Sequence, residues 1–199
     1  MNVAAATEQM RKLFGWDIPT MEQRVEAVPA GADGILFLPY LQGERTPNLP
    51  KGKGVFHGLT TENMTADFMA RAVVEGVTLG LAYGLRRFRE LGIVPTEIRF
   101  TGGGSKSAVW RQIATDVLGF PTVALRVTEG AALGAAIQAA WTHAKVKGKP
   151  MKLEKLVDDL VVVEKKTRIE PQKESAAFYQ EQLLRQIDLT KKLKTGGYL

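Results

Sequence analysis

The sequence predicts an α/β fold built in layers, and three observations lead to this prediction. Two strand–turn–helix units follow one another between residues 97 and 141. The uninterrupted apolar run at residues 35–38 indicates a further buried strand. Segments with helical spacing of apolar residues surround these strands. Because strands that alternate with helices are typical of sheets covered by helices, we expect one domain over residues 1–199.

The first elements are expected to be short. Residues 3–14 place apolar side chains at helical spacing before Gly15, which predicts a helix. A second short helix is predicted at residues 21–28, ahead of the buried strand at residues 35–38. Residues 42–61 are rich in Gly, Pro, Asn and Lys with little periodicity, so we expect a long irregular connection there.

The longest helix is expected at residues 65–92, and its apolar residues cover most of its circumference, which predicts burial. Glycines recur in it at every fourth position, and each costs about 1 kcal/mol of helix propensity. We expect close packing against a neighbouring element to compensate. Glu75 follows Arg71 by four residues and is expected to pair with it; a catalytic acid is the less favoured alternative. The three glycines are Gly76, Gly80 and Gly84.

The second half of the chain repeats one order of elements. A strand at residues 97–101, a glycine turn at 102–104 and a helix at 105–118 form the first unit. A strand at residues 122–125 and a helix of small residues at 131–141 form the second.

The basic tail begins at about residue 145. We expect a short strand at residues 160–163 and a final helix at 173–192. Residues 1–144 would form the core, and residues 145–199 would pack on it rather than form a separate domain. The apolar face of the final helix would comprise Ala177, Leu184, Ile187 and Leu189.

Composition excludes several kinds of function. The 199 residues include no cysteine and two histidines, which excludes disulfides, thiolate catalysis and a His/Cys metal cluster, so we assign no metal site to the chain. The 27 Lys and Arg exceed the 21 Asp and Glu and give a net charge of +6. These basic residues are scattered and not interleaved with aromatic ones, so solvated surface is favoured over a nucleic-acid partner.

Neither a membrane nor a secretory signal is indicated. The longest apolar run, residues 72–85, contains Glu75, is flanked by arginines and is too short for a bilayer. The first residues lack the basic and apolar regions of a signal peptide. We therefore expect a cytoplasmic protein without a membrane partner.

The glycine turn is the strongest candidate site. Gly102, Gly103 and Gly104 leave backbone N–H groups bare beside a helix N-terminus, an arrangement that suits anions and planar bases. Ser105 and Ser107 can each cap the helix or donate to a ligand. Many such turns bind nothing, so the two interpretations are equally supported by the residues.

Two other segments favour structural interpretations. The small residues at 129–136 are better explained by helix packing than by a ligand. Glu44 and Arg45 lie in the long connection, where an ion pair within the loop is favoured over phosphate binding. His57 is expected to be an ordinary loop histidine.

Several ordered motifs resemble the C-terminal domain of the FGGY family of carbohydrate kinases, and within it the xylulokinases most closely. The resemblance covers about residues 3–141 and is specific because the motifs occur together and in order. They are the stretch at 35–47, Gly58-Leu59-Thr60, the helix segment 70–77, the run Thr101-Gly102-Gly103-Gly104-Ser105-Lys106-Ser107, and residues 129–136.

This resemblance implies a ribonuclease H-like, actin-like ATPase fold, with the chain as the C-terminal lobe of a two-lobe sugar kinase. Such kinases bind ATP and sugar between their lobes, and a xylulokinase would convert D-xylulose to D-xylulose 5-phosphate. The implied cofactor is ATP or ADP with Mg²⁺, and the implied partners include the sugar substrate. The residues implied to lie against the adenosine are Gly102, Gly103, Gly104, Ser105 and Ser107, with Ser107 near the adenine.

The sequence also departs from the family pattern. It contains no counterpart of the N-terminal lobe, which carries the first phosphate loop and the aspartate general base, nor of the Gly-Thr-Ser phosphate turn. Phe68 replaces a residue that is usually polar. We therefore expect no catalytic residue in this chain and no kinase activity from it alone.

The expected partners follow from this. They are an adenine nucleotide, the N-terminal lobe and, through exposed apolar surface, a second copy of the chain. The alternative is a non-catalytic binding or scaffold module that kept the fold of a kinase lobe.

Overall fold

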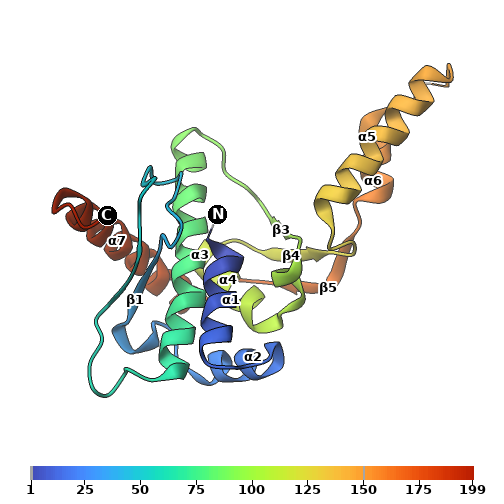
Figure 1. The fold of residues 1–199 in the computed structure, drawn as a ribbon. Helices are drawn as coiled ribbons and strands as arrows, with labels where there is room; N and C mark the ends of the chain where they lie inside the picture. Colours follow the sequence, from blue (N-terminus) through green and yellow to red (C-terminus); the bar gives the residue numbers. More distant parts are fainter. Residues whose placement is uncertain (1, 150) are drawn as a thin grey trace.

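The computed structural model describes residues 2–149 and 151–199 and combines seven helices with five strands in those ranges (Figure 1). Two short 3₁₀ turns, η1 (Ala32–Gly34) and η2 (Gly103–Lys106), join neighbouring elements. The elements in chain order are α1 (Val3–Leu13), α2 (Ile18–Ala27), β1 (Leu36–Pro39), β2 (Gly54–His57), α3 (Ala66–Glu90), β3 (Ile98–Phe100), α4 (Ala108–Leu118), β4 (Thr122–Leu125), α5 (Gly130–Val146), α6 (Leu153–Leu160), β5 (Val163–Ile169) and α7 (Lys173–Thr195).

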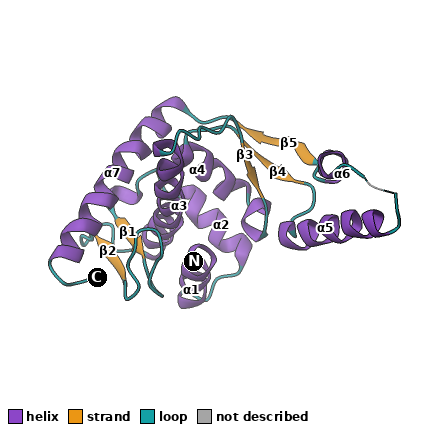
Figure 2. Cartoon of the chain, turned by 90° about the horizontal axis from the view of Figure 1, so that it is seen from above, coloured by secondary structure: helices purple, strands orange, loops and turns teal. Residues whose placement is uncertain are grey.

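The strands form two small sheets. β1 and β2 pair antiparallel, with Phe37 opposite Phe56. The second sheet has the order β3-β4-β5, in which β3 and β4 are parallel and β4 and β5 are antiparallel. Figure 2 shows helices packed beside both sheets. The predicted mixed α/β fold is therefore confirmed.

Helix α3 lies at the centre of the core. It contacts α1, α2, α4, α7 and β1, and its residues 70–79 are all buried. By length and composition it could span a membrane, but 61% of its most apolar window is buried inside the protein. The prediction of a long buried helix is confirmed over its first half, whereas residues 86–90 are exposed.

The glycines of α3 differ in how closely they are packed. A Cβ atom at Gly76 would lie 2.4 Å from the carbonyl oxygen of Phe37 in β1, so no side chain fits there. At Gly80 the nearest atom would be 3.9 Å away, and at Gly84 no atom lies within 4 Å. The predicted close packing is thus confirmed at Gly76 and wrong at Gly84.

A buried polar network ties α3 to α7. Arg71 Nε donates to Glu75 Oε1 at 2.6 Å, which confirms the predicted ion pair. The Tyr179 hydroxyl donates to the same oxygen at 2.7 Å, and the Gly31 backbone N–H donates to it at 3.0 Å. Burial opposes the charge on Arg71, but Glu75 and Tyr179 together outweigh it and raise the pKa of the guanidinium. Glu75 is therefore a structural anchor, as favoured by the sequence.

The face that α7 buries is more polar than predicted. Gln186 Nε2 donates to the carbonyl oxygens of Phe37 at 3.0 Å and Gly76 at 3.1 Å. Ala177 and Leu184 of the predicted apolar face are exposed, while Ile187 and Leu189 are half-buried. The prediction was wrong for the first two because the stripe that contacts the core consists of Tyr179, Gln182, Leu183, Gln186 and Thr190.

Four element predictions need correction. Strand β2 lies inside the connection that was expected to be irregular, and it pairs with β1. The expected strand at residues 160–163 is wrong: Leu160 ends the helix α6, and the strand β5 begins at Val163. Helix α4 begins at Ala108 rather than residue 105, and α5 extends to Val146.

Helices α5 and α6 project from the body of the molecule (Figure 1). α5 is rich in alanine, yet Ile137 is its one buried residue in the described part of the chain. The tail that follows returns to the body through β5 and α7, and α7 packs on α3, α4 and β1.

Candidate functional site

The glycine turn connects β3 to α4 through the 3₁₀ turn η2. Gly102 has φ +84°, a conformation that favours glycine, and its backbone N–H donates to the Thr128 carbonyl at 2.8 Å. Ser107 is the N-cap of α4, because its hydroxyl oxygen accepts from the Trp110 backbone N–H at 3.1 Å. The cap lies at Ser107, two residues later than the predicted start, because residues 103–106 form η2.

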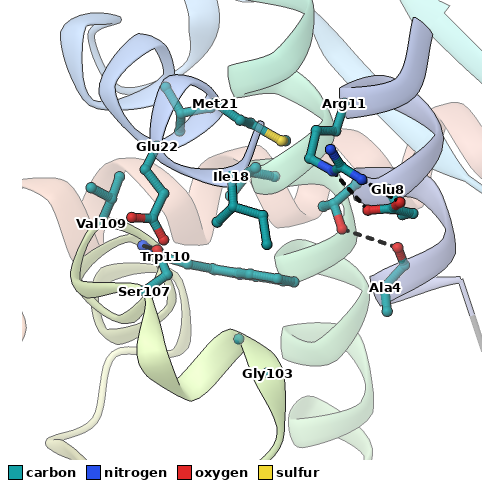
Figure 3. A pocket seen from close by; sticks show the side chains of 14 residues that line it. Ala4, Glu8, Arg11, Ile18, Met21, Glu22, Gly103, Ser107, Val109 and Trp110 are labelled. Carbon is teal, nitrogen blue, oxygen red and sulfur yellow. Dashed lines mark hydrogen bonds and ion pairs between the residues drawn. The ribbon is translucent and has the colours of Figure 1, made fainter. Parts of the chain in front are cut away.

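A cavity of about 350 Å³ opens beside this turn. Helices α1 and α2 form one wall of the cavity, and the glycine turn with the start of α4 forms another (Figure 3). Helix α3 contributes one side chain, Val74. The volume falls in the range of about 300–1,000 Å³ that is usual for small-molecule sites. Its lining residues are Ala4, Thr7, Glu8, Arg11, Ile18, Met21, Glu22, Val25, Val74, Gly103, Gly104, Ser107, Val109 and Trp110.

The predicted site residues separate into two groups. Gly103, Gly104 and Ser107 line the cavity. Gly102 and Ser105 do not line it; Ser105 is buried, and its hydroxyl donates to the Gly102 carbonyl oxygen at 2.7 Å. Ser105 therefore holds the turn in shape, and Gly102 supplies the backbone conformation that the turn needs.

Trp110 gives the cavity a flat wall. A Cβ atom at Gly104 would lie 3.2 Å from the Trp110 ring, so the bare backbone of the turn packs against the indole. The indole N–H donates to the Thr78 hydroxyl oxygen at 3.0 Å, which fixes the ring relative to α3. Figure 3 shows Ile18 above this ring. Flat aromatic and aliphatic surfaces of this kind accommodate planar bases.

The opposite end of the cavity carries an ion pair. Arg11 donates to Glu8 through Nε at 2.9 Å and Nη2 at 2.6 Å, and through Nη1 to the Trp16 carbonyl at 2.6 Å. The hydrogen bond from Arg11 lowers the pKa of Glu8, and the same bond raises the pKa of Arg11. Both side chains stay ionised around neutral pH, and their charges offset one another.

Glu22 and Ser107 supply the polar groups at the α2 side. Figure 3 shows the Glu22 carboxylate directed toward Ser107. Among the residues that the structure describes, Glu22 has no hydrogen-bond or ion-pair partner. A carboxylate acceptor and a hydroxyl that can donate thus lie on the side of the cavity opposite the Arg11–Glu8 pair.

The sequence did not reveal the contributions of α1 and α2. Ala4, Thr7, Ile18 and Glu22 belong to no motif, and only the packing of the two helices on α3 brings them to the turn. The periodicity of α1 and α2 could have indicated their buried faces. It carries no information about their contact with the glycine turn, which lies far along the chain.

The remaining candidate segments are structural. A Cβ atom at Gly130 would lie 2.7 Å from Thr101 Oγ1, which supports the packing interpretation for that segment. Glu44 accepts from the backbone N–H of Arg45 at 2.8 Å and from Asn2 Nδ2 at 3.0 Å, in place of the expected side-chain ion pair. Within residues 2–149 and 151–199, no group of three or more His, Asp or Glu side chains is suited to hold a metal ion.

Comparison with known proteins assigns the chain to a family. The model of the FGGY family of carbohydrate kinases, C-terminal domain, matches residues 5–143, and the chain belongs to this family. The xylulose kinase of Haemophilus influenzae is 42% identical over 143 residues, which cover 72% of this chain and 29% of that protein. The xylulose kinase of Escherichia coli is 39% identical over 60% of this chain and 25% of its own length.

Solved structures show the same fold. The xylulose kinase of Rhodospirillum rubrum aligns with a TM-score of 0.81 and 28% identity, over 96% of this chain and 38% of its own. A ligand-bound xylulose kinase from Lactobacillus acidophilus aligns with a TM-score of 0.85 and 26% identity, over 97% of this chain and 38% of its own. The actin-like fold expected of an FGGY kinase lobe is confirmed, and the chain spans less than half the length of these relatives.

Proposed function

We propose that this chain is the adenosine-binding C-terminal lobe of an ATP-dependent sugar kinase. The observation that carries the proposal is the cavity between α1, α2 and the glycine turn, with Gly103, Gly104 and Ser107 in its lining. Membership of a family of carbohydrate kinases supplies the class of reaction.

The cavity suits an adenine base better than a phosphate group. Its walls are mostly apolar, and the Arg11 guanidinium is already paired with Glu8. A Cβ atom at Gly103 would meet no atom within 4 Å, so the backbone of the turn leaves open space where a ribose or a base can approach. The Glu22 carboxylate can accept from an exocyclic amine, and the Ser107 hydroxyl can donate to a ring nitrogen.

We propose no catalytic residue in this chain and no turnover by it alone. Phosphoryl transfer depends on groups that position the phosphate and stabilise its charge from both sides of a cleft. The described residues supply the base-binding surface, and we assign no ligand for Mg²⁺ to them. The general base and the sugar site would come from the companion lobe, by the family resemblance.

The names of the relatives favour D-xylulose as the sugar of the complete enzyme and D-xylulose 5-phosphate as its product. We propose a cytoplasmic site of action on the same grounds. A coupled assay with ATP, Mg²⁺ and D-xylulose tests the inactivity of this chain, and turnover above background would refute it.

Calorimetric titration with ADP and with MgATP tests the proposed function directly. Ser107→Trp places an indole in the cavity and should abolish binding. Ala108→Trp is the matched control, because Ala108 is the next residue, is exposed and does not line the cavity. Ser107→Ala removes the N-cap and the hydroxyl that would donate to the base but leaves the space open, so it should still bind, only more weakly.

Binding by the unmodified chain, Ala108→Trp and Ser107→Ala, with loss in Ser107→Trp, is the expected pattern. Absence of binding by the unmodified chain, or binding that Ser107→Trp leaves intact, would contradict an adenosine site at this turn.

A further inference from the structure

The glycine turn depends on contacts with its surroundings to keep its shape. Residues 102–104 are all glycine, and because glycine populates positive and negative φ about equally, the turn has little conformational preference of its own. Its start is fixed by the Gly102 N–H, which donates to the Thr128 carbonyl oxygen. Its end is fixed by the Ser105 carbonyl oxygen, which accepts from Arg111 Nη1 at 2.6 Å. Arg111 thus connects the end of the turn to helix α4.

Arg111 acts on the turn from outside the cavity. Its backbone N–H donates to the Ser107 carbonyl oxygen at 3.0 Å, so Arg111 holds the residues on both sides of Lys106. Gly103, Gly104 and Ser107 line the cavity of about 350 Å³, whereas Arg111 does not. Any effect of the Arg111 side chain on a ligand in that cavity therefore passes through the turn.

The Arg111 side chain is otherwise poorly satisfied. Its Nε atom is buried and has no hydrogen-bond partner. Among residues 2–149 and 151–199, no carboxylate forms an ion pair with it. A buried donor without an acceptor opposes folding, whereas a methionine would fill similar space without that cost. The hydrogen bond to Ser105 is offset by these costs, so stability alone does not account for an arginine at this position.

We propose that Arg111 is a positioning residue for the nucleotide: it holds the glycine turn in the shape that binds adenosine, without touching the nucleotide itself. This inference rests on the proposed function, which assigns the adenosine to this turn. A surface that is already ordered binds more tightly than one that the ligand must order. Without the contact between Arg111 and Ser105, the ligand would have to order three consecutive glycines.

Two neighbouring substitutions in α4 test this role. Arg111→Met keeps an unbranched side chain and a high helix propensity but lacks the donor to Ser105. Gln112→Met is the matched control, because Gln112 is the next residue, is also half-buried and donates to Asp116 within α4 rather than to the turn. Calorimetric titration with ADP measures the Kd of each variant. Arg111→Met should raise the Kd about tenfold, and Gln112→Met should leave it unchanged.

Titration with adenosine separates positioning from charge. Adenosine carries no phosphate, so the loss of a positive charge at residue 111 does not change its long-range attraction to the protein. A role in positioning should weaken the binding of adenosine and of ADP by the same factor of about ten. A loss confined to ADP would overturn the proposal, because it would assign Arg111 to the attraction of phosphate groups.

Amide hydrogen exchange and urea unfolding locate the effect. The backbone N–H groups of Ser105 and Ser107 donate within the turn, to the carbonyl oxygens of Gly102 at 3.1 Å and Gly104 at 3.3 Å. In Arg111→Met both amides should exchange at least about tenfold faster, while the amides of the buried residues 114–118 keep their rates. The urea midpoint should stay unchanged, because the lost contact and the removed unpaired donor have opposite effects on stability.

Two further results would overturn the proposal. One is unchanged exchange of the Ser105 and Ser107 amides in Arg111→Met. The other is a lower urea midpoint with faster exchange throughout α4, which would make Arg111 a general stabilising residue. If the unmodified chain binds neither ADP nor adenosine, the proposed function itself fails. If the unmodified chain binds both and Arg111→Met binds them equally well, only the role of Arg111 fails.

Discussion

Gly76→Ala tests the closest packing contact in the core. A Cβ atom at Gly76 would lie 2.4 Å from the Phe37 carbonyl oxygen and 2.9 Å from Phe37 Cβ. Ordinary contacts begin at 3.4 Å, so α3 and β1 must separate by about 1 Å to admit a methyl group. Gln186 donates to the carbonyls of both residues, and its two hydrogen bonds would lengthen as the elements part.

The expected magnitude follows from these contacts. Overpacking of a well-packed core costs about 1–3 kcal/mol, and a weakened buried hydrogen bond costs about 1 kcal/mol more. Alanine gains about 1 kcal/mol over glycine in helix propensity. We expect the free energy of unfolding to fall by about 2 kcal/mol in Gly76→Ala.

Gly84→Ala is the matched control on the same helix. No atom lies within 4 Å of the added Cβ, so only the helix propensity changes, and the free energy of unfolding should rise by about 1 kcal/mol. Urea unfolding followed by far-UV circular dichroism measures both variants. Equal or same-signed effects of the two substitutions would refute the conclusion that β1 presses on α3 at Gly76.

Three further outcomes are expected from the polar contacts. Tyr179→Phe removes a buried donor to Glu75 and should lower the free energy of unfolding by about 1–3 kcal/mol in urea; a neutral effect would exclude the hydroxyl from the network. Burial, then the nearby Glu75, raises the pKa of Tyr179, so the folded chain keeps a proton that unfolded tyrosine loses at about pH 10. This contribution to stability is fully present below about pH 10 and is lost as the pH rises further. Between pH 9 and 11 the free energy of unfolding, measured by urea denaturation, should therefore fall less with pH in Tyr179→Phe than in the unmodified chain. Ser107→Ala should cost about 1 kcal/mol through its lost N-cap but Ser107→Gly only a few tenths, and equal losses would contradict a capping role.

Local sequence patterns were sufficient for the central elements. The periodicity of residues 65–92 predicted α3, and the i, i+4 spacing of Arg71 and Glu75 predicted their pairing. The strand–turn–helix order predicted β3, β4 and α4. These features depend on residues close together in the chain, so local patterns are enough to predict them.

Elements that depend on distant partners were harder to predict. β2 is only four residues long and lies among glycines and prolines, so its pairing with β1 left little local signal. The helix α6 does show helical spacing, at Leu153, Leu156, Val157 and Leu160, but the adjacent valines favoured a strand. A closer count of that spacing would have identified the helix.

In the candidate site, too, local features could be predicted from the sequence and features that depend on distant partners could not. The glycine turn was visible because glycines and serines follow a strand, but Ser105 and Ser107 were indistinguishable as caps until η2 placed the second at the helix start. The walls from α1 and α2 required the tertiary packing on α3.

The attachment of α7 through hydrogen bonds has a consequence for biosynthesis. The last helix leaves the ribosome after the rest of the core, and until then Glu75 lacks the Tyr179 hydroxyl and two carbonyls lack the Gln186 amide. Each of these hydrogen bonds contributes about 0.5–1.5 kcal/mol to the stability of the folded chain. A nascent chain that lacks α7 is therefore expected to be less stable, and cellular proteases should remove more of such chains. The polar face of α7 thus makes the stability of the core depend on synthesis of the chain through Thr195.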